Sequence, residues 1–169
     1  MHAELELANR RLSDFLNAHS ELTLHNVRLQ GHADGMVITA DEFDLRLDEV
    51  LAVEAAGWRG HPERRVRTKT RRADLVLGPY RVLGRLHAPP SADAFQALHL
   101  RRTMVPLTDV TIALPMNGQT IMRDVETLIV NRHAIDVLAE QPAELLADLP
   151  LAVAIDPRAK DMTGEIYAN

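Results

Sequence analysis

The stretch with the greatest potential for chemistry is a basic run near the middle of the chain. RRVRTKTRR, residues 64–72, holds six cations in nine residues, whereas the whole chain has a formal net charge of −5. In an extended strand alternate side chains share one face, and cations two residues apart lie roughly 7 Å from each other, near the phosphate spacing of a nucleic-acid strand. The candidate polyanion-binding residues are therefore Arg64, Arg65, Arg67, Lys69, Arg71 and Arg72.

An acidic stretch before the basic run offers these cations a different role. Residues 41–54, DEFDLRLDEVLAVE, hold six carboxylates and one arginine, and Glu42, Asp44 and Asp48 fall on the opposite face from the apolar residues between them. If the acidic and basic strands lay side by side, each cross-strand ion pair would contribute about 0.2–1 kcal/mol. We favour this pairing over a nucleic-acid site, because six aromatic residues in the whole chain give few stacking platforms. Protection of a sheet edge or a subunit contact is the third possibility.

Two apolar features are candidate partner-binding elements. Trp58 lies between glycines in a loop, where it either anchors a partner or, as we favour, folds back over the end of a sheet. The tail GEIYAN carries Ile166 and Tyr167, which either complete the protein's own sheet, as we favour, or add a strand to a neighbouring subunit. The first half of the chain leaves strand edges to be covered, so we expect a homo-oligomer and treat the tail as a second possible contact with a protein partner.

Catalytic and metal chemistry have little support. The eight histidines form no His-x-x-x-His pair, there is no cysteine, and no Gly-x-Ser-x-Gly elbow or phosphate-binding glycine loop occurs. Arg101-Arg102 supplies an arginine pair like that of PilZ-type cyclic-dinucleotide-binding barrels, but the Asp/Asn-x-Ser-x-x-Gly motif does not follow. A hydrolase site built from His25, Asp109 and His133 is kept as a minor hypothesis. We predict no catalytic residues, no metal and no cofactor.

The chain length and apolar pattern indicate the kind of fold. A chain of 169 residues suits one domain with a sizeable core, and no window approaches the roughly 18 apolar residues of a membrane span. The N-terminus lacks the apolar run of a signal peptide, so we expect a cytoplasmic protein without membrane attachment.

Apolar positions repeat along the chain at an offset of 83 residues. The corresponding positions are Leu12 and Phe95, Phe15 and Leu98, Leu24 and Leu107, Val27 and Val110, and the turn dipeptides Asp34-Gly35 and Asn117-Gly118. With two extra residues, Phe43, Leu45 and Val50 then correspond to Leu128, Val130 and Ile135. The polar pairs His25-Asn26 and Thr108-Asp109 also correspond, and inside apolar strands they indicate either a site or, as we favour, a bulge.

The apolar spacing and turn dipeptides in each half therefore predict a short helix followed by a three-stranded β-meander. The expected strands are 22–30, 36–40 and 43–53 in the first half, and 108–114, 119–123 and 128–138 in the second. Residues 63–88 form a basic hairpin between the halves, with its turn at Gly78-Pro79. We expect an α+β, β-rich fold in which duplicated units form a barrel or wrapped antiparallel sheet with two or three short helices. Residues 1–141 would be one domain of two units, about 10–55 and 92–140, followed by a C-terminal helix, strand and tail over 142–169.

Three short motifs resemble pieces of short bacterial β-rich domains of uncharacterised function. They are LSDFLN at residues 12–17, PLTD at 106–109 and VNR at 130–132. The motifs are split between the two halves, and the first half has LHNV where the second has LTDV. The resemblance implies a duplicated small β domain and no activity. The sequence thus predicts a non-enzymatic, self-associating assembly, scaffold or regulatory module, with a nucleic-acid- or nucleotide-binding protein as the alternative.

Overall fold

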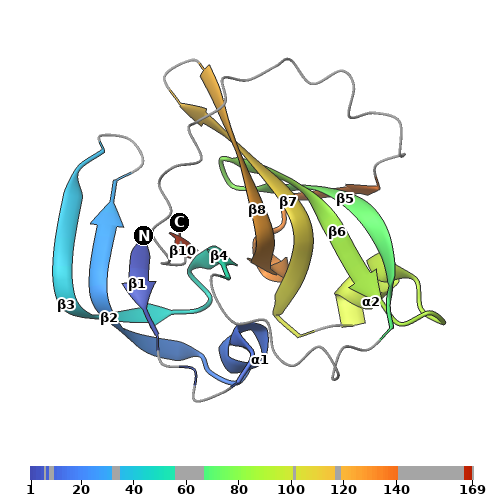
Figure 1. Ribbon diagram of the computed structural model, residues 1–169, viewed down its shortest axis with the longest axis horizontal. Helices are drawn as coiled ribbons and strands as arrows, with labels where there is room; N and C mark the ends of the chain where they lie inside the picture. Colours follow the sequence, from blue (N-terminus) through green and yellow to red (C-terminus); the bar gives the residue numbers. More distant parts are fainter. Residues whose placement is uncertain are drawn as a thin grey trace.

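Two antiparallel sheets and a few short helices make up the protein, in the parts of the chain that the structure describes (Figure 1). The computed structural model describes residues 1–5, 7, 10–31, 35–55, 67–100, 102–116, 119–140 and 166–168. In chain order the elements are β1 (His2–Glu4), α1 (Leu12–Leu16), β2 (Glu21–Gln30), β3 (Val37–Arg46), β4 (Val50–Glu54), β5 (Lys69–Leu77), β6 (Tyr80–Ala88), α2 (Ala94–Leu100), β7 (Met104–Met116), β8 (Gln119–Asn131), the 3-10 turn η2 (Arg132–Ala134), β9 (Val137–Glu140) and β10 (Ile166–Ala168). The β-rich class predicted from the sequence is confirmed.

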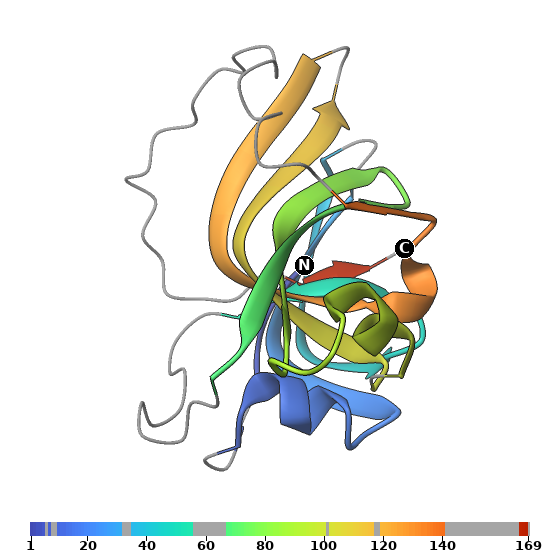
Figure 2. The same ribbon diagram turned by 90° about the vertical axis from the view of Figure 1, so that its right-hand side faces the viewer.

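The strands are divided between a small sheet and a large sheet. The small sheet has the order β1-β2-β3, and the large sheet has the order β10-β4-β8-β7-β6-β5-β9. Both hairpins predicted around residues 31–36 and 117–118 are present, as is the hairpin that turns at Gly78-Pro79. Among the described residues neither sheet closes on itself, so the expectation of a barrel is wrong. The long β7–β8 hairpin extends beyond the neighbouring strands (Figure 2).

The predicted third strand of each unit is also wrong. β3 runs through Asp41 and Glu42 to Arg46, and the chain then turns before β4. Charged side chains do not end a strand when its outer face is in water, so these two acidic residues were misread as a boundary. In the second half β8 likewise continues to Asn131, where η2 interrupts the predicted strand 128–138.

Buried apolar residues form two cores on opposite faces of the large sheet. The intersheet core lies between the sheets and contains Leu16, Leu22, Leu24, Val27, Leu45, Leu47, Val50, Val53, Met104 and Ile129. The α2 core contains Ala52, Ala73, Leu75, Leu77, Val82, Leu86, Ala88, Ala94, Leu98, Val105, Leu107, Val110, Ile112, Val125, Leu128 and Val130. Successive residues of a strand point to opposite faces, so β8 contributes Ile129 to the first core and its two neighbours to the second.

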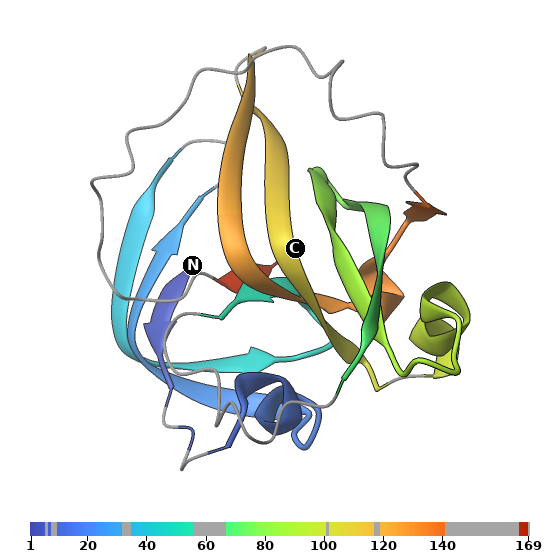
Figure 3. The ribbon, with the colours of Figure 1, turned by 45° about the vertical axis from the view of Figure 1, so that its right-hand side comes forward.

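A single asparagine ties the small sheet's helix to the large sheet. Asn17, at the end of α1, donates from Nδ2 to the Met104 carbonyl at 2.8 Å and accepts from the Met104 amide at 2.9 Å through Oδ1. This pair of bonds satisfies the backbone of the first residue of β7. Figure 3 shows α1 beneath the place where the two sheets meet, with α2 lying beside β5 and β6.

Both long hairpins contain a left-handed residue at the same place. Asn26 has φ 50° and Asp109 has φ 51°, the two non-glycine residues of the described chain with positive φ. Strand pairing in each hairpin skips this residue. Residues three apart would face opposite sides of a regular strand, but this turn of the backbone lets Leu24 and Val27 both enter the intersheet core. The bulge predicted at the two polar pairs is confirmed on the other side of each strand, where the register shifts in the pairing of β2 with β1 and of β7 with β6.

Substitution at these two positions tests the backbone requirement. We expect Asp109→Val to unfold with a free energy about 1–2 kcal/mol lower than Asp109→Gly, because a β-branched residue is strained at positive φ and glycine is not. Asn26→Val and Asn26→Gly should differ in the same way. Urea denaturation measures the difference. Equal stabilities within each pair would mean that the strands relax to a regular conformation.

Candidate functional site

The basic strand is solvent-exposed at its N-terminal end. Arg67, Lys69 and Arg71 are exposed and Arg72 is half-buried, whereas Arg64, Arg65 and Trp58 lie outside the described residues. β5 pairs with β6 over its whole length, but β9 covers the other side only from Ala73 to Val76. Within the described chain, residues 69–72 therefore leave one backbone edge without a neighbouring strand.

The predicted pairing of the basic strand with the acidic strand is wrong. β3 lies in the small sheet, whereas β5 lies in the large sheet. The acidic side chains have local contacts instead: Glu42 Oε1 lies 3.6 Å from His25 Nδ1, and Asp44 accepts a 2.8 Å bond from the Thr23 hydroxyl. The prediction failed because β4 returns from β3 along β8 rather than leading directly into β5.

Two carboxylates near the basic strand come from elements that the sequence did not connect with it. Arg71 forms a 3.0 Å ion pair with Glu140 of β9. Asp93 accepts the backbone N–H groups of Gln96 and Phe95 at the start of α2, at 3.0 and 2.9 Å. The hydrogen bond from Gln96 is the main reason that the pKa of Asp93 is lowered, and the positive charges of Arg71 and Lys69 add to it. The basic strand is thus partly balanced by β9 and α2.

The face of β5, β6 and β7 turned away from the α2 core carries an array of polar side chains. Arg81 forms a bidentate pair with Asp74, with Nε at 3.0 Å and a terminal nitrogen at 2.6 Å, and this hydrogen bonding raises the pKa of Arg81. His87 lies between two hydroxyls, 3.0 Å from Thr68 Oγ1 and 2.7 Å from Thr108 Oγ1. In this array the side chain of Arg81 is half exposed, whereas that of Asp74 is largely buried beneath it.

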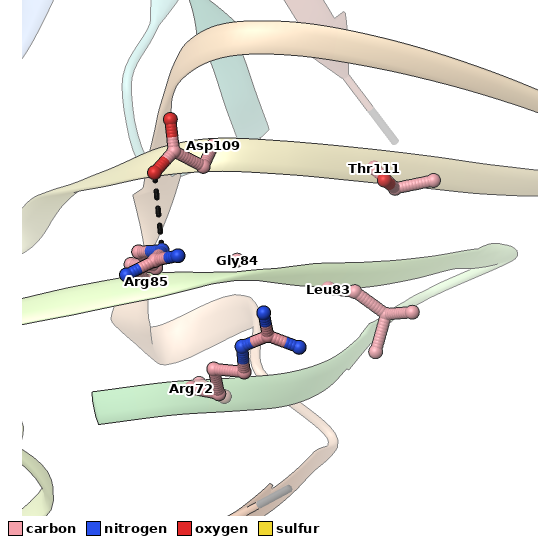
Figure 4. Close-up of a pocket in the computed structure, with 7 residues that line it drawn as sticks. Arg72, Leu83, Gly84, Arg85, Asp109 and Thr111 are labelled. Carbon is pink, nitrogen blue, oxygen red and sulfur yellow. Dashed lines mark ion pairs between the residues drawn. The ribbon is translucent and has the colours of Figure 1, made fainter. Parts of the chain in front are cut away.

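A shallow pocket lies within this polar face (Figure 4). Its volume is about 100 Å³, and it is lined by Arg72, Ala73, Leu83, Gly84, Arg85, Asp109 and Thr111. Arg72 and Arg85 are directly opposite each other across β5 and β6. Arg85 Nε lies 3.0 Å from Asp109 Oδ2. Sequence reasoning singled out Arg72 within the basic run and Asp109 within a polar pair, but it missed Arg85.

A larger hollow of about 540 Å³ lies where α1, the β3–β4 turn and the start of β7 meet. Its lining includes His19, His133 and Asn131. The hydrolase hypothesis is not supported, because its three residues lie at different places. His133 lines this hollow, Asp109 lines the smaller arginine pocket, and His25 faces Glu42 on the small sheet. In the described residues no group of three or more histidine, aspartate or glutamate side chains is placed to hold a metal ion.

The C-terminal tail adds a strand to the protein's own sheet. In β10, Ile166 pairs with Val53 and Tyr167 pairs with Ala52, both in β4. This is the arrangement that the sequence favoured over donation to a neighbour. A contact between the tail and a partner protein stays a prediction.

Comparison with models of known protein families, with curated proteins and with solved structures gave no match. Within the described residues, no helix has both the length and the apolar character needed to cross a membrane. The candidate surfaces are therefore the exposed strand edges and the arginine pocket, judged on their own geometry.

Proposed function

We propose that this protein is a non-enzymatic assembly module that binds further copies of itself through two oppositely charged strand edges. The acidic edge is β3, with the exposed residues Asp41, Glu42 and Asp44. The basic edge is the start of β5, with the exposed residues Arg67, Lys69 and Arg71. The observation that carries the proposal is that both edges lack a neighbouring strand in the described chain and carry opposite charge.

The acidic edge has the properties of a strand that accepts a partner. β3 is ten residues long and, among the strands that the structure describes, pairs with β2 alone, so its outer side offers backbone N–H and C=O groups. Val37 and Ile38, the first two residues of β3, are large apolar side chains that are 43% and 50% exposed. The three carboxylates would repel one another if two β3 strands paired, and they would attract a basic strand.

The basic edge supplies the complementary charge. Arg67 and Lys69 form no ion pair with any residue that the structure describes, and Arg71 shares its charge with the exposed Glu140. Each facing pair of opposite charges contributes about 0.2–1 kcal/mol. Salt screens such exposed pairs over about 8 Å at physiological ionic strength, so the association should weaken as salt is added.

The two edges lie on opposite sides of the molecule, β3 at the left and β5 at the right of Figure 1. Contacts between two different surfaces do not close a two-fold dimer, and they build rings or open chains. We therefore expect a series of oligomers whose size rises with protein concentration.

The β2–β3 and β7–β8 hairpins correspond residue by residue. This correspondence supports a duplication, and it identifies a part of β3 that lacks the neighbouring strand its counterpart in β8 has, within the described chain. Residues that pair in the first hairpin, such as Leu24 with Phe43, correspond to a pair in the second, Leu107 with Leu128, at offsets of 83 and 85. We propose that the hairpins are copies of one unit. In the second copy β4 pairs with β8 at Leu128–Val130. The corresponding part of β3, residues 43–45, has no such neighbour in the described chain.

Charge reversal tests the proposal. Arg67→Glu with Lys69→Glu makes both edges acidic, and Glu42→Lys with Asp44→Lys makes both edges basic. Each double variant should be monomeric by size-exclusion chromatography with light scattering, whereas the wild type should be oligomeric at low salt. An equimolar mixture of the two variants should associate, because each acidic edge can then meet a basic one. Arg10→Glu with Arg102→Glu makes the same change of charge at exposed residues outside β2, β3 and β5 and should leave the wild-type mass unchanged.

Two results would contradict the proposal. The first is a wild-type protein that is monomeric at every salt concentration, and the second is a mixture of the charge-reversed variants that does not associate. Because the cations are exposed, the nucleic-acid alternative must be tested as well. Fluorescence anisotropy of labelled oligonucleotides at about 50 and 200 mM salt measures that binding. A monomeric wild type that binds oligonucleotides, and loses that binding in Arg67→Glu with Lys69→Glu, would replace the assembly function with nucleic-acid binding.

A further inference from the structure

Arg72 and Arg85 form a like-charged pair that needs a physical explanation. They are direct cross-strand partners on β5 and β6, and both are half-buried on the face turned away from the α2 core. Like charges directly opposite each other destabilise a sheet. Such a pair is favourable where an anion lies between the two guanidinium groups.

The protein itself supplies one carboxylate for these two cations. Asp109 Oδ2 lies 3.0 Å from Nε of Arg85, an arrangement that leaves the two terminal nitrogens of Arg85 to other acceptors. Arg72 forms no hydrogen bond or ion pair with the described residues. The pocket therefore has two positive charges and one negative charge, and Figure 4 shows the guanidinium group of Arg72 on the same side of the sheet as Arg85.

A bulge between β6 and β7 builds this arrangement. Leu83 pairs with Thr111 and Arg85 pairs with Thr108, so Gly84 alone faces both Asp109 and Val110. The bulge and the left-handed backbone of Asp109 direct its carboxylate outward, where its side chain is 73% exposed. Gly84 fits because a β-carbon on it would lie 3.0 Å from the Val110 side chain. The pocket is thus part of the fold.

We infer that this pocket binds a single phosphate group, as inorganic phosphate or as the terminal phosphate of a small molecule. Guanidinium groups bind phosphate oxygens through paired N–H donors, and two arginines line this pocket. A volume of about 100 Å³ suits one such group. Asp109 at the rim and Asp124, which accepts a 2.6 Å bond from the Thr111 hydroxyl, would repel a second phosphate. A continuous nucleic-acid backbone is therefore disfavoured.

Titration with inorganic phosphate, followed by two-dimensional NMR of backbone amides and arginine Nε–H groups, tests the site. The wild type should show saturable shifts centred on Gly84, Arg85 and Arg72. Arg72→Gln is expected to weaken binding by about tenfold, the factor that corresponds to about 1.4 kcal/mol. Arg72→Lys keeps the charge but loses the fork, so its affinity should lie between those of Arg72→Gln and the wild type. Arg28→Gln removes the same charge from the small sheet and should bind phosphate like the wild type.

Asp109→Asn gives the result that separates a phosphate site from a purely structural ion pair. Asparagine tolerates the left-handed backbone and removes the competing negative charge, so phosphate affinity should rise by about threefold or more. A fall in affinity, or shifts that are spread over the surface or unaffected by Arg72→Gln, would overturn the inference.

The source of the phosphate is distinguished by three ligands. Inorganic phosphate and a small phosphate monoester should shift the same resonances, and the tighter of the two identifies the better ligand. An oligonucleotide without terminal phosphates should not compete, and competition by it would overturn the small-ligand inference in favour of nucleic acid. The double variant Arg67→Glu with Lys69→Glu should retain phosphate binding, so this inference and the assembly proposal can fail independently.

Discussion

Replacing Leu107 with alanine is expected to lower the free energy of unfolding by about 2–5 kcal/mol. Leu107 is fully buried at the centre of the α2 core. Its truncation removes apolar contacts and leaves a cavity that strands on both sides of β7 hold open. Urea denaturation followed by circular dichroism gives the change in free energy.

Leu24→Ala is the matched variant in the intersheet core, where Leu24 is also fully buried. A similar loss of about 2–5 kcal/mol is expected, and both variants should shift one common transition. Val137→Ala is the control, because that side chain is 53% exposed and its loss should change stability by less than about 0.5 kcal/mol. If each core variant shifted a separate transition, the prediction of one domain over residues 1–141 would be wrong.

The second large effect is expected at Asn131, the buried polar side chain at the end of β8. Its Nδ2 donates to the Val50 carbonyl at 3.0 Å, and its Oδ1 accepts from the His133 amide at 3.0 Å. Asn131→Ala takes away the donor to the Val50 carbonyl and the acceptor for the His133 amide. It should therefore lower the free energy of unfolding by about 1–3 kcal/mol. The same denaturation experiment measures it.

Asn131→Asp distinguishes hydrogen bonding from simple filling of space. The aspartate keeps an acceptor for His133 but places a carboxylate oxygen against the Val50 carbonyl. At neutral pH it should therefore be less stable than Asn131→Ala, even though it preserves the volume of the side chain. An aspartate variant as stable as the wild type would contradict this expectation.

Local signals in the sequence located α1, α2 and three hairpins of the described chain, whereas the C-terminal helix expected after residue 141 lies outside the described residues. The dipeptides Asp34-Gly35, Asn117-Gly118 and Gly78-Pro79 predicted hairpins whose flanking strands do pair, and the spacing of Leu12 and Phe15 predicted α1. The arrangement of the hairpins was not predictable in the same way. It depends on β4 crossing to pair with β8, a contact between residues far apart in the sequence. That crossing separated β3 from β5 and made the predicted neutralisation of the cations wrong.

The candidate pocket was predictable in part. A two-residue turn at Gly78-Pro79 places Leu77 opposite Tyr80, and counting outward from it places Arg72 opposite Arg85. The arginine pair could therefore have been found from the sequence. The contact between Arg85 and Asp109 could not, because it depends on the register of β6 against β7 across α2 and on the bulge at Gly84.

The sharing of β8 between two cores affects how the chain can fold during its synthesis. The small sheet's strands leave the ribosome first, but the intersheet core also needs Met104 and Ile129. Until the chain has been made as far as residue 129, Leu24 and Val27 lack part of the surface that buries them. The nascent chain would thus expose an apolar face from the synthesis of Leu24 until that of Ile129, a period in which chaperone binding protects such surfaces.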